Sequence, residues 1–337
     1  MSSSSGRGAA SADADGGSER FAPATLLGDD VEAFERVLAG QSPGPLAVCS
    51  APFGGRYSVL EHAADQLGVD LLCLDPGDGA ESVLSALGDG PVVIDGWQHL
   101  YERRIGGFGP LDTVLRAIVE STDPVVAGWN SYAWTYLTRV RGIDRTFAAR
   151  AEVETIAAND LAALVLDRYD EIPEFTAEQA DVGGLLASRR YELDWRGHTV
   201  SVPVPALNRA RITASLTDSE VDPKDVVFER LAAVSEGNVG VATALWEASR
   251  RAEVRPSDIV APGADLDLDR EEAFCLRILL LKERVTRAEL NRIIDDTERV
   301  LGRLLRDGMV STADGVVRLE PTAVPAAITE TERRDRN

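Results

Sequence analysis

The sequence predicts an α/β fold with a parallel sheet, followed by a small C-terminal domain of three helices and a hairpin. Five short apolar runs alternate with segments in which apolar residues recur at helical spacing. The runs lack the polar alternation of a strand with one face in water, which indicates a sheet covered by helices on both faces. We expect strands at residues 46–51, 70–75, 91–95, 124–130 and 151–156, with helices at 59–67, 80–87, 110–121 and 131–140, the last capped by Ser131.

The next part of the chain has a different pattern. We expect a helix that is capped by Asn159 or Asp160 and ends near residue 169. Polar and apolar residues then alternate on both sides of Arg196-Gly197, which predicts a hairpin over residues 191–204. Helical spacing returns at residues 225–235 and 239–251.

The last part of the chain begins after a linker at residues 260–269. A helix is expected from 271 to 282, and the capping box Thr286-Arg-Ala-Glu289 opens a second helix that ends near 295. A third helix at 297–306 stops at Gly308. Strands at 309–312 and 316–319 complete the plan of a winged helix-turn-helix domain.

Composition bounds the class of protein. The chain has 337 residues, 44% of them hydrophobic, and a formal net charge of −21. Only two of its 35 basic residues are lysines, Lys224 and Lys282. An acidic surface with arginine in preference to lysine is typical of cytoplasmic proteins from salt-adapted archaea, because carboxylates maintain solubility where salt screens charge. The alternative is an ordinary acidic protein.

The cysteines and histidines indicate buried thiols and give no basis for a metal site built from these two residue types. Cys49, Cys73 and Cys275 lie in apolar runs and are expected to be buried thiols in a reducing compartment. The three histidines are scattered, so they form no recognisable ligand set. No apolar stretch approaches the ~18–20 residues that span a bilayer. Residues 1–20 and 328–337 are expected to be polar tails, and the cytoplasm is the expected compartment.

The segment at 46–58 carries the strongest functional signal. A strand, a small turn and a helix form the context of a phosphate-binding P-loop. The pattern G-x-x-x-x-G-K-[ST] fits only at Gly55, because Ser50, Arg56 and Tyr57 replace its glycine, lysine and small hydroxyl residue. The phosphates of ATP or ADP are expected to meet Arg56 and the loop backbone; the alternative is a strand-to-helix turn without ligand. The candidate binding residues are Ser50, Gly54, Gly55, Arg56, Tyr57 and Ser58.

Polar residues end two further strands. Asp95 follows an apolar run as the acid of a Walker B segment does, and together with Ser58 it is the candidate Mg²⁺ ligand; the alternative is a strand-end aspartate that binds loop amides. A second acid would normally come next, but Gly96, Trp97 and Gln98 follow. Asn130 ends the fourth strand at the position of a phosphate sensor, although asparagine is also common in turns. The candidate catalytic residues are Asp95, Gln98 and Asn130.

The segment 235–242 is similar to the G-N-P-R-x-A segment of an ATPase lid, with Gly240 at the arginine position. Taken with the motifs above, the chain resembles the AAA+/STAND class of P-loop ATPases that carry a C-terminal winged helix. The resemblance implies a 5-1-4-3-2 sheet, a helical lid and assembly controlled by nucleotide. The implied division is a tail (1–20), a P-loop core (21–157), a lid with a hairpin insertion (158–262), a winged helix (263–327) and a charged tail (328–337).

A basic stripe marks the expected winged helix. Arg299, Arg303 and Arg306 recur at helical spacing on one face of the 297–306 helix, opposite its apolar face. These arginines are the candidate contacts to DNA. A solvated helix face or a surface for protein contacts would show the same spacing.

Three tryptophans, Trp97, Trp129 and Trp134, lie near the expected strand ends. We expect them to fill the core, with stacking on adenine or a partner surface as the alternative. The departures at Arg56, Tyr57 and Gly240 and the missing second acid all predict impaired hydrolysis. We therefore expect a regulatory or scaffolding protein that responds to nucleotide and has a protein partner or self-associates. The alternatives are a slow but genuine ATPase and a DNA-binding regulator.

Overall fold

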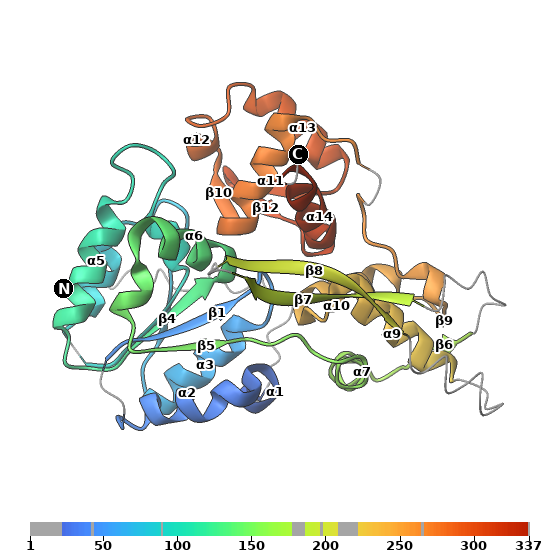
Figure 1. The fold of residues 1–337 in the computed structure, drawn as a ribbon, viewed down its shortest axis with the longest axis horizontal. Helices are drawn as coiled ribbons and strands as arrows, with labels where there is room; N and C mark the ends of the chain where they lie inside the picture. The colour runs from blue at the N-terminus through green and yellow to red at the C-terminus, as the bar shows by residue number, and fades with distance from the viewer. Residues whose placement is uncertain are drawn as a thin grey trace, which may run out of the picture.

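The computed structural model describes residues 22–41, 44–88, 90–176, 186–195, 198–207, 222–263 and 266–335. Its centre is a five-stranded parallel sheet with strand order β2-β3-β4-β1-β5 (Figure 1). This is the predicted 5-1-4-3-2 order, and every pairing in the sheet is parallel. The strands are β1 (Leu46–Ser50), β2 (Leu71–Cys73), β3 (Val92–Asp95), β4 (Val125–Asn130) and β5 (Ala149–Glu152).

The fifth strand begins and ends earlier than predicted. Residues 153–156 leave the sheet, because their amides bond elsewhere: Glu154 N–H donates to Leu26 O at 2.8 Å and Ile156 N–H donates to Gly237 O at 2.9 Å. The apolar residues that suggested a strand there pack instead against the first helix and the lid.

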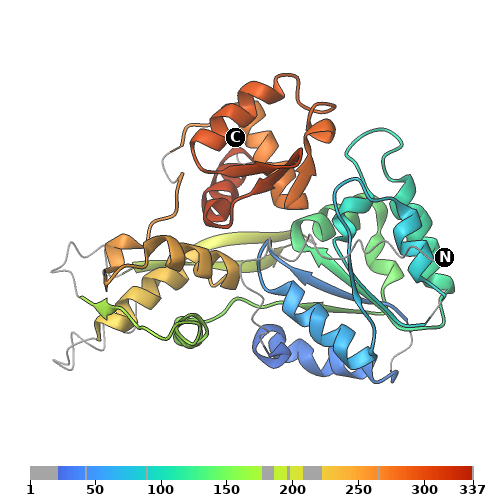
Figure 2. The ribbon, with the colours of Figure 1, turned by 180° about the vertical axis from the view of Figure 1, so that it is seen from behind.

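Helices cover both faces of the sheet, as predicted (Figures 1 and 2). One face packs on α1, α2 and α3, which supply Leu26, Phe34 and Leu60 to a continuous apolar cluster. The other face packs on α4, α5 and α6 around Trp129. The helices are α1 (Pro23–Leu27), α2 (Val31–Leu38), α3 (Arg56–Leu67), α4 (Ala80–Ala86), α5 (Gly109–Glu120) and α6 (Ser131–Arg141).

Two predicted helix caps are wrong. The side chain of Asn130, and not that of Ser131, caps α6 by accepting from the amides of Tyr132 and Ala133. Helix α7 (Ala158–Leu166) begins before the asparagine and aspartate predicted to cap it, and its N-cap Ala157 offers no side-chain bond. The chain enters α7 from the lid contact at residue 156, which sets the start of the helix earlier.

The lid packs α7 against α9 (Pro223–Ser235) and α10 (Val239–Ser249). A short parallel pair joins β6 (Glu174–Phe175) to β9 (Glu253–Val254). The predicted hairpin is present and longer than expected, with β7 (Leu186–Trp195) antiparallel to β8 (His198–Leu207). It extends past the lid helices toward the core (Figures 1 and 2), and its predicted turn, Arg196-Gly197, lies outside the described residues.

The C-terminal elements follow the order predicted for a winged helix. Thr286 caps α12 by accepting from Glu289 N–H, although α12 is only one turn long. Residues 328–335, predicted to lie in a charged tail, belong to α14, which buries Val324 and Ala327 against α11. The elements are α11 (Arg270–Lys282), β10 (Arg284–Thr286), α12 (Arg287–Leu290), α13 (Thr297–Arg306), β11 (Val310–Ala313), β12 (Val316–Leu319) and α14 (Val324–Asp335), with sheet order β10-β12-β11.

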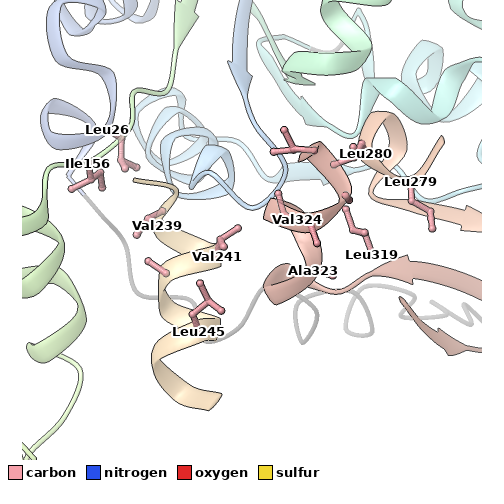
Figure 3. Close-up of a cluster of buried hydrophobic side chains, with 14 of the residues drawn as sticks. Leu26, Ile156, Val239, Val241, Leu245, Leu279, Leu280, Leu319, Ala323 and Val324 are labelled. Carbon is pink, nitrogen blue, oxygen red and sulfur yellow. The ribbon is translucent and has the colours of Figure 1, made fainter. Parts of the chain in front are cut away.

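One apolar cluster joins the core, the lid and the C-terminal domain. Figure 3 shows Leu26 of α1 near Val239 of α10, and Leu280 of α11 near Val324 of α14. Helix α11 also packs on α6 and on the short helix η3 (Trp97–Leu100), which follows β3. The C-terminal domain is therefore seated on the edge of the sheet where the strands end.

Candidate functional site at the P-loop

The carboxyl ends of three strands bring the predicted polar residues together. Ser50 and Asn130 are paired across β1 and β4, and Asp95 ends β3 on the other side of β4. The loop after β1 leads directly into α3, whose first residue is Arg56. In open parallel sheets this edge is where ligands bind.

The loop has the tight backbone that its glycines predict. Gly55 has a φ of +93° and is the N-cap of α3, a conformation that favours glycine. A Cβ on Gly54 would lie 3.0 Å from Ala51 O, because Gly54 N–H donates to that same carbonyl. The Gly54-Gly55 pair thus lets the chain turn back over the end of β1.

Arg56 is buried and fully engaged. Its Nε lies 2.7 Å from Asp95 Oδ1 and its Nη2 lies 3.4 Å from Asp95 Oδ2, a two-pronged pair. Its Nη1 donates to Ser50 Oγ at 3.3 Å and to Trp129 O at 3.2 Å. Burial disfavours the charged guanidinium, but the attraction of Asp95 and Glu283 outweighs it and raises the pKa of Arg56 above its ordinary value.

A glycine that the sequence did not single out makes room for this pair. Gly128 lies on β4 beside Asp95, and a Cβ there would lie 2.3 Å from Asp95 Oδ1. The Asp95 carboxylate therefore rests over a position that admits no side chain. A glycine inside an apolar strand signals such a close approach, but it does not say what approaches.

Glu283 of the C-terminal domain completes the site, although no motif in the sequence pointed to it. The residue is the C-cap of α11, and its Oε1 lies 3.4 Å from both Nη1 and Nη2 of Arg56. The same oxygen accepts from Asn130 Nδ2 at 2.9 Å. A charged residue at the end of a helix is usually solvated, so nothing local distinguishes this one.

Asn130 has no spare hydrogen bond for a further ligand. Its Nδ2 donates to Leu280 O at 2.9 Å as well as to Glu283, and its Oδ1 caps α6. Its backbone N–H donates to Gln98 Oε1 at 3.3 Å. Of the predicted catalytic residues, Asp95 contacts Arg56 and Asn130 contacts Glu283. Gln98 accepts the hydrogen bond from the backbone of Asn130 and, within the portion of the chain that the structure describes, forms no hydrogen bond to Arg56 or Glu283.

As long as Asp95 and Glu283 both hold Arg56, the site does not fit a magnesium nucleotide. Both oxygens of Asp95, the candidate metal ligand, are paired with Arg56. Nucleotide phosphates at this edge would meet two carboxylates, Asp95 and Glu283, with one guanidinium between them. Ser58, the other candidate ligand, is buried in the first turn of α3. Within the described ranges, no three His, Cys, Asp or Glu residues are grouped closely enough to hold a metal ion.

The lid closes the loop from the other side. Gly240 N–H donates to Phe53 O at 3.0 Å, and Asn238 Nδ2 donates to Pro52 O at 2.8 Å. A Cβ on Gly240 would lie 2.3 Å from Phe53 O, so the residue that replaces the lid arginine allows this contact. Val239 and Leu26 lie against Gly55: a Cβ added at Gly55 would be 3.2 Å from Val239 and 3.4 Å from Leu26.

The predicted DNA-contacting arginines lie among carboxylates. Arg299 pairs with Asp269 at 2.6 Å, with Glu271 at 2.8 Å and with the fully buried Glu272 at 3.1 Å. Arg303 pairs with Glu272 at 3.4 Å and donates to Asp267 O at 2.8 Å. Two of the three predicted contacts are therefore engaged within their own domain.

The aromatic and thiol predictions have clear outcomes. Trp97, Trp129 and Trp134 are buried in one aromatic cluster, with the rings of Trp97 and Trp129 5.5 Å apart, so they fill the core as expected. Cys49 and Cys275 are buried free thiols, and burial raises the pKa of each to about 12. Cys73 is only partly buried, contrary to expectation, because its strand β2 lies at the edge of the sheet.

Comparison with known proteins finds no matching family model and no matching curated protein. Among solved structures, the chain is similar to the Thermotoga maritima RuvB Holliday junction branch migration motor, with 12% identity and a TM-score of 0.41 over 90% of this chain and 95% of that chain. It is also similar to the Aeropyrum pernix ORC2 protein in its ADPNP-ADP complexes, with 11% identity and a TM-score of 0.39 over 91% and 94% of the two chains. In the described part of the chain, no helix is both long and apolar enough to cross a membrane.

Proposed function

We propose that this protein is a regulatory or scaffolding module of the AAA+ type that does not hydrolyse ATP at an appreciable rate. One observation carries the proposal: the P-loop cation, Arg56, is held by Asp95 at 2.7 Å instead of being free for a phosphate. Phosphoryl transfer depends on a positioned positive charge and a positioned metal ion. Here Arg56, the positive charge, and Asp95, the candidate metal ligand, are paired with each other.

ATP or ADP enters this proposal as a signal and not as a fuel. A nucleotide gains access to Arg56 only when a carboxylate leaves it, so binding is coupled to a change in the protein's own contacts. The cytoplasm supplies both nucleotides and keeps free thiols reduced, which agrees with three free cysteines.

The test is phosphate release by the full chain with Mg-ATP, at low and at molar KCl. We expect turnover far below the ~1–10³ s⁻¹ of competent enzymes. Arg56→Lys restores the lysine of the P-loop pattern and is expected to remain inactive, because Tyr57 and the missing second acid are unchanged. A turnover near ~1 s⁻¹ that Asp95→Ala abolishes would establish the slow-ATPase alternative instead.

A nucleotide response is measured separately. Millimolar ATP or ADP is expected to shift the thermal melting of the full chain, since a ligand that binds the folded state stabilises it by mass action. An unchanged melting temperature with both nucleotides would contradict the nucleotide response and indicate a scaffold that does not bind nucleotide.

A further inference from the structure

Three consecutive residues of the C-terminal domain reach the ends of four strands. Lys282 Nζ donates to Tyr101 O, which lies just beyond β3 and η3. Glu283 contacts Arg56 after β1 and Asn130 at the end of β4. Arg284 pairs with Asp75, after β2, at 2.7 Å. Residues 282–284 therefore lie at the edge where ligands bind in open parallel sheets.

Glu283 is held in a backbone conformation that its own helix does not require. Its φ is +62° and its ψ is −43°, close to a strained γ-turn conformation that L-residues rarely adopt. The side chain that this backbone directs into the core is only 16% exposed. Backbone hydrogen bonds also hold this conformation, because Glu283 N–H donates to Leu279 O at 2.6 Å and Glu283 O accepts from Leu319 N–H at 3.0 Å. The carboxylate is in turn held by Arg56 and Asn130.

The charges around Glu283 make its position exclusive. Arg56 already neutralises the charge of Asp95. The carboxylate of Glu283 is therefore stabilised by the Nη1 and Nη2 donors of the same guanidinium and by the side-chain amide of Asn130. The oxygens of a phosphate would need the same two donors. Two anionic ligands cannot share them without strong repulsion at this degree of burial.

We propose that Glu283 is a built-in carboxylate ligand of the P-loop, which locks the C-terminal domain on the core until the phosphate group of a nucleotide displaces it. The inference rests on the proposed function and deepens it by naming the contact that the signal breaks. Displacement frees residues 282–284 from the strand ends, while the C-terminal domain stays joined to the lid where α10 packs on the short helix η6 (Pro321–Ala323).

Hydrogen exchange of the full chain without nucleotide tests the lock. Glu283→Gly removes the carboxylate and suits the positive φ, so the C-terminal domain keeps its fold. Glu283→Gln keeps an oxygen for Asn130 and loses only the charge. In both variants we expect amide exchange at residues 50–58 and 278–286 to rise roughly tenfold or more, with exchange in β11 unchanged.

Glu253→Gln is the matched control, because it removes one carboxylate from an exposed pair with Arg255, away from the interface. It is expected to leave exchange at both segments as in the wild type. Wild-type exchange at both segments in Glu283→Gly would overturn the lock.

Displacement is tested by the affinity for Mg-ATP, with inorganic phosphate as the second probe. If the lock is closed in ~90% or more of molecules, its removal strengthens apparent binding by at least about tenfold. We therefore expect Glu283→Gly to bind Mg-ATP at least roughly tenfold more tightly than wild type or Glu253→Gln. If inorganic phosphate opens the wild-type lock as well as ATP does, the claim that a nucleotide supplies the displacing phosphate is overturned.

Equal ATP affinity in the wild type and in Glu283→Gly would overturn competition at this site. These outcomes are distinct from failure of the proposed function, which appears only as phosphate release by the wild-type protein.

Discussion

Lys282 Nζ lies 2.8 Å from Glu289 Oε1, and both side chains are almost completely buried where the C-terminal domain meets the core. The pair links the end of α11 to α12, while Lys282 also donates to Tyr101 O of the core. Burial lowers the pKa of Lys282, and the attraction of Glu289 opposes that shift. The charged lysine is therefore retained by its partner.

Lys282→Met is expected to destabilise the protein strongly, because it leaves the Glu289 carboxylate buried and unpaired. Breaking a buried pair from one side typically costs about 3–5 kcal/mol, whereas replacing both partners by apolar residues is often close to neutral. Denaturant unfolding of Lys282→Met and of Lys282→Met/Glu289→Leu measures both values. Arg292→Met is the control, since its pair with Glu102 is more exposed and worth about 0–1 kcal/mol. A double variant as unstable as Lys282→Met would contradict this account.

Two glycine-to-alanine substitutions are expected to act in opposite directions. Gly128→Ala places a Cβ 2.3 Å from Asp95 Oδ1 and 2.4 Å from Leu60 Cδ1, so the Arg56–Asp95 pair must shift. We expect a loss of about 1–3 kcal/mol of unfolding free energy, as for other overpacked sites. Gly302→Ala meets nothing within 4 Å on helix α13 and is expected to stabilise by about 0.5–1 kcal/mol. Equal effects of the two substitutions would show that the space over β4 is not limiting.

The sheet was predictable because its signal is local. Uninterrupted apolar runs between amphipathic segments fixed the number and order of elements, and the strand ends then brought Ser50, Asp95 and Asn130 to one edge. Helix α13 was predicted at its observed bounds, because an apolar stripe defines its face and Gly308 marks its end. The predicted bounds of β5 were wrong, because the backbone N–H groups of residues 154 and 156 form hydrogen bonds to α1 and to the lid instead of to β1.

The contacts that decide the site are non-local, and for that reason the sequence did not reveal them. Glu283 lies 227 positions from Arg56 in the chain, and no periodicity or motif connects the two. That Arg56 meets the phosphates of a nucleotide stays a prediction; in the structure its partners are Asp95 and Glu283, two carboxylates of the protein itself. Likewise, the sequence alone predicts that Arg299 is an exposed basic residue, and only the packing of α13 brings it to Asp269 and Glu272.

Charge reversal on α13 tests whether this face contacts DNA. Arg299→Glu sets a fifth carboxylate beside Asp269, Glu271, Glu272 and Asp296, so the melting temperature is expected to fall more than in Arg306→Glu. We expect the wild type not to retain duplex DNA at ~0.15 M salt, because the engaged arginines are not available to phosphates. Gel-shift assays over a salt series measure this. Duplex binding that is lost in Arg306→Glu, with the fold intact, would establish the DNA-binding alternative.

His99 predicts how stability depends on pH. It is buried on η3, and neither ring nitrogen has a hydrogen-bond partner among the described residues. Burial lowers the pKa of His99 well below its ordinary value, and the positive charges of Lys282, Arg284 and Arg56 lower it further. The folded protein therefore holds His99 neutral.

The unfolded chain takes up a proton at His99 near its unperturbed pKa of about 6.5, whereas the folded chain does not. The stability that the neutral ring allows is thus fully present above that pH and falls below it, by up to about 1.4 kcal/mol per pH unit. Denaturant unfolding between pH 7.5 and 5.5 should show a shallower pH slope for His99→Leu than for wild type. Identical slopes for wild type and His99→Leu would mean that the folded protein protonates His99.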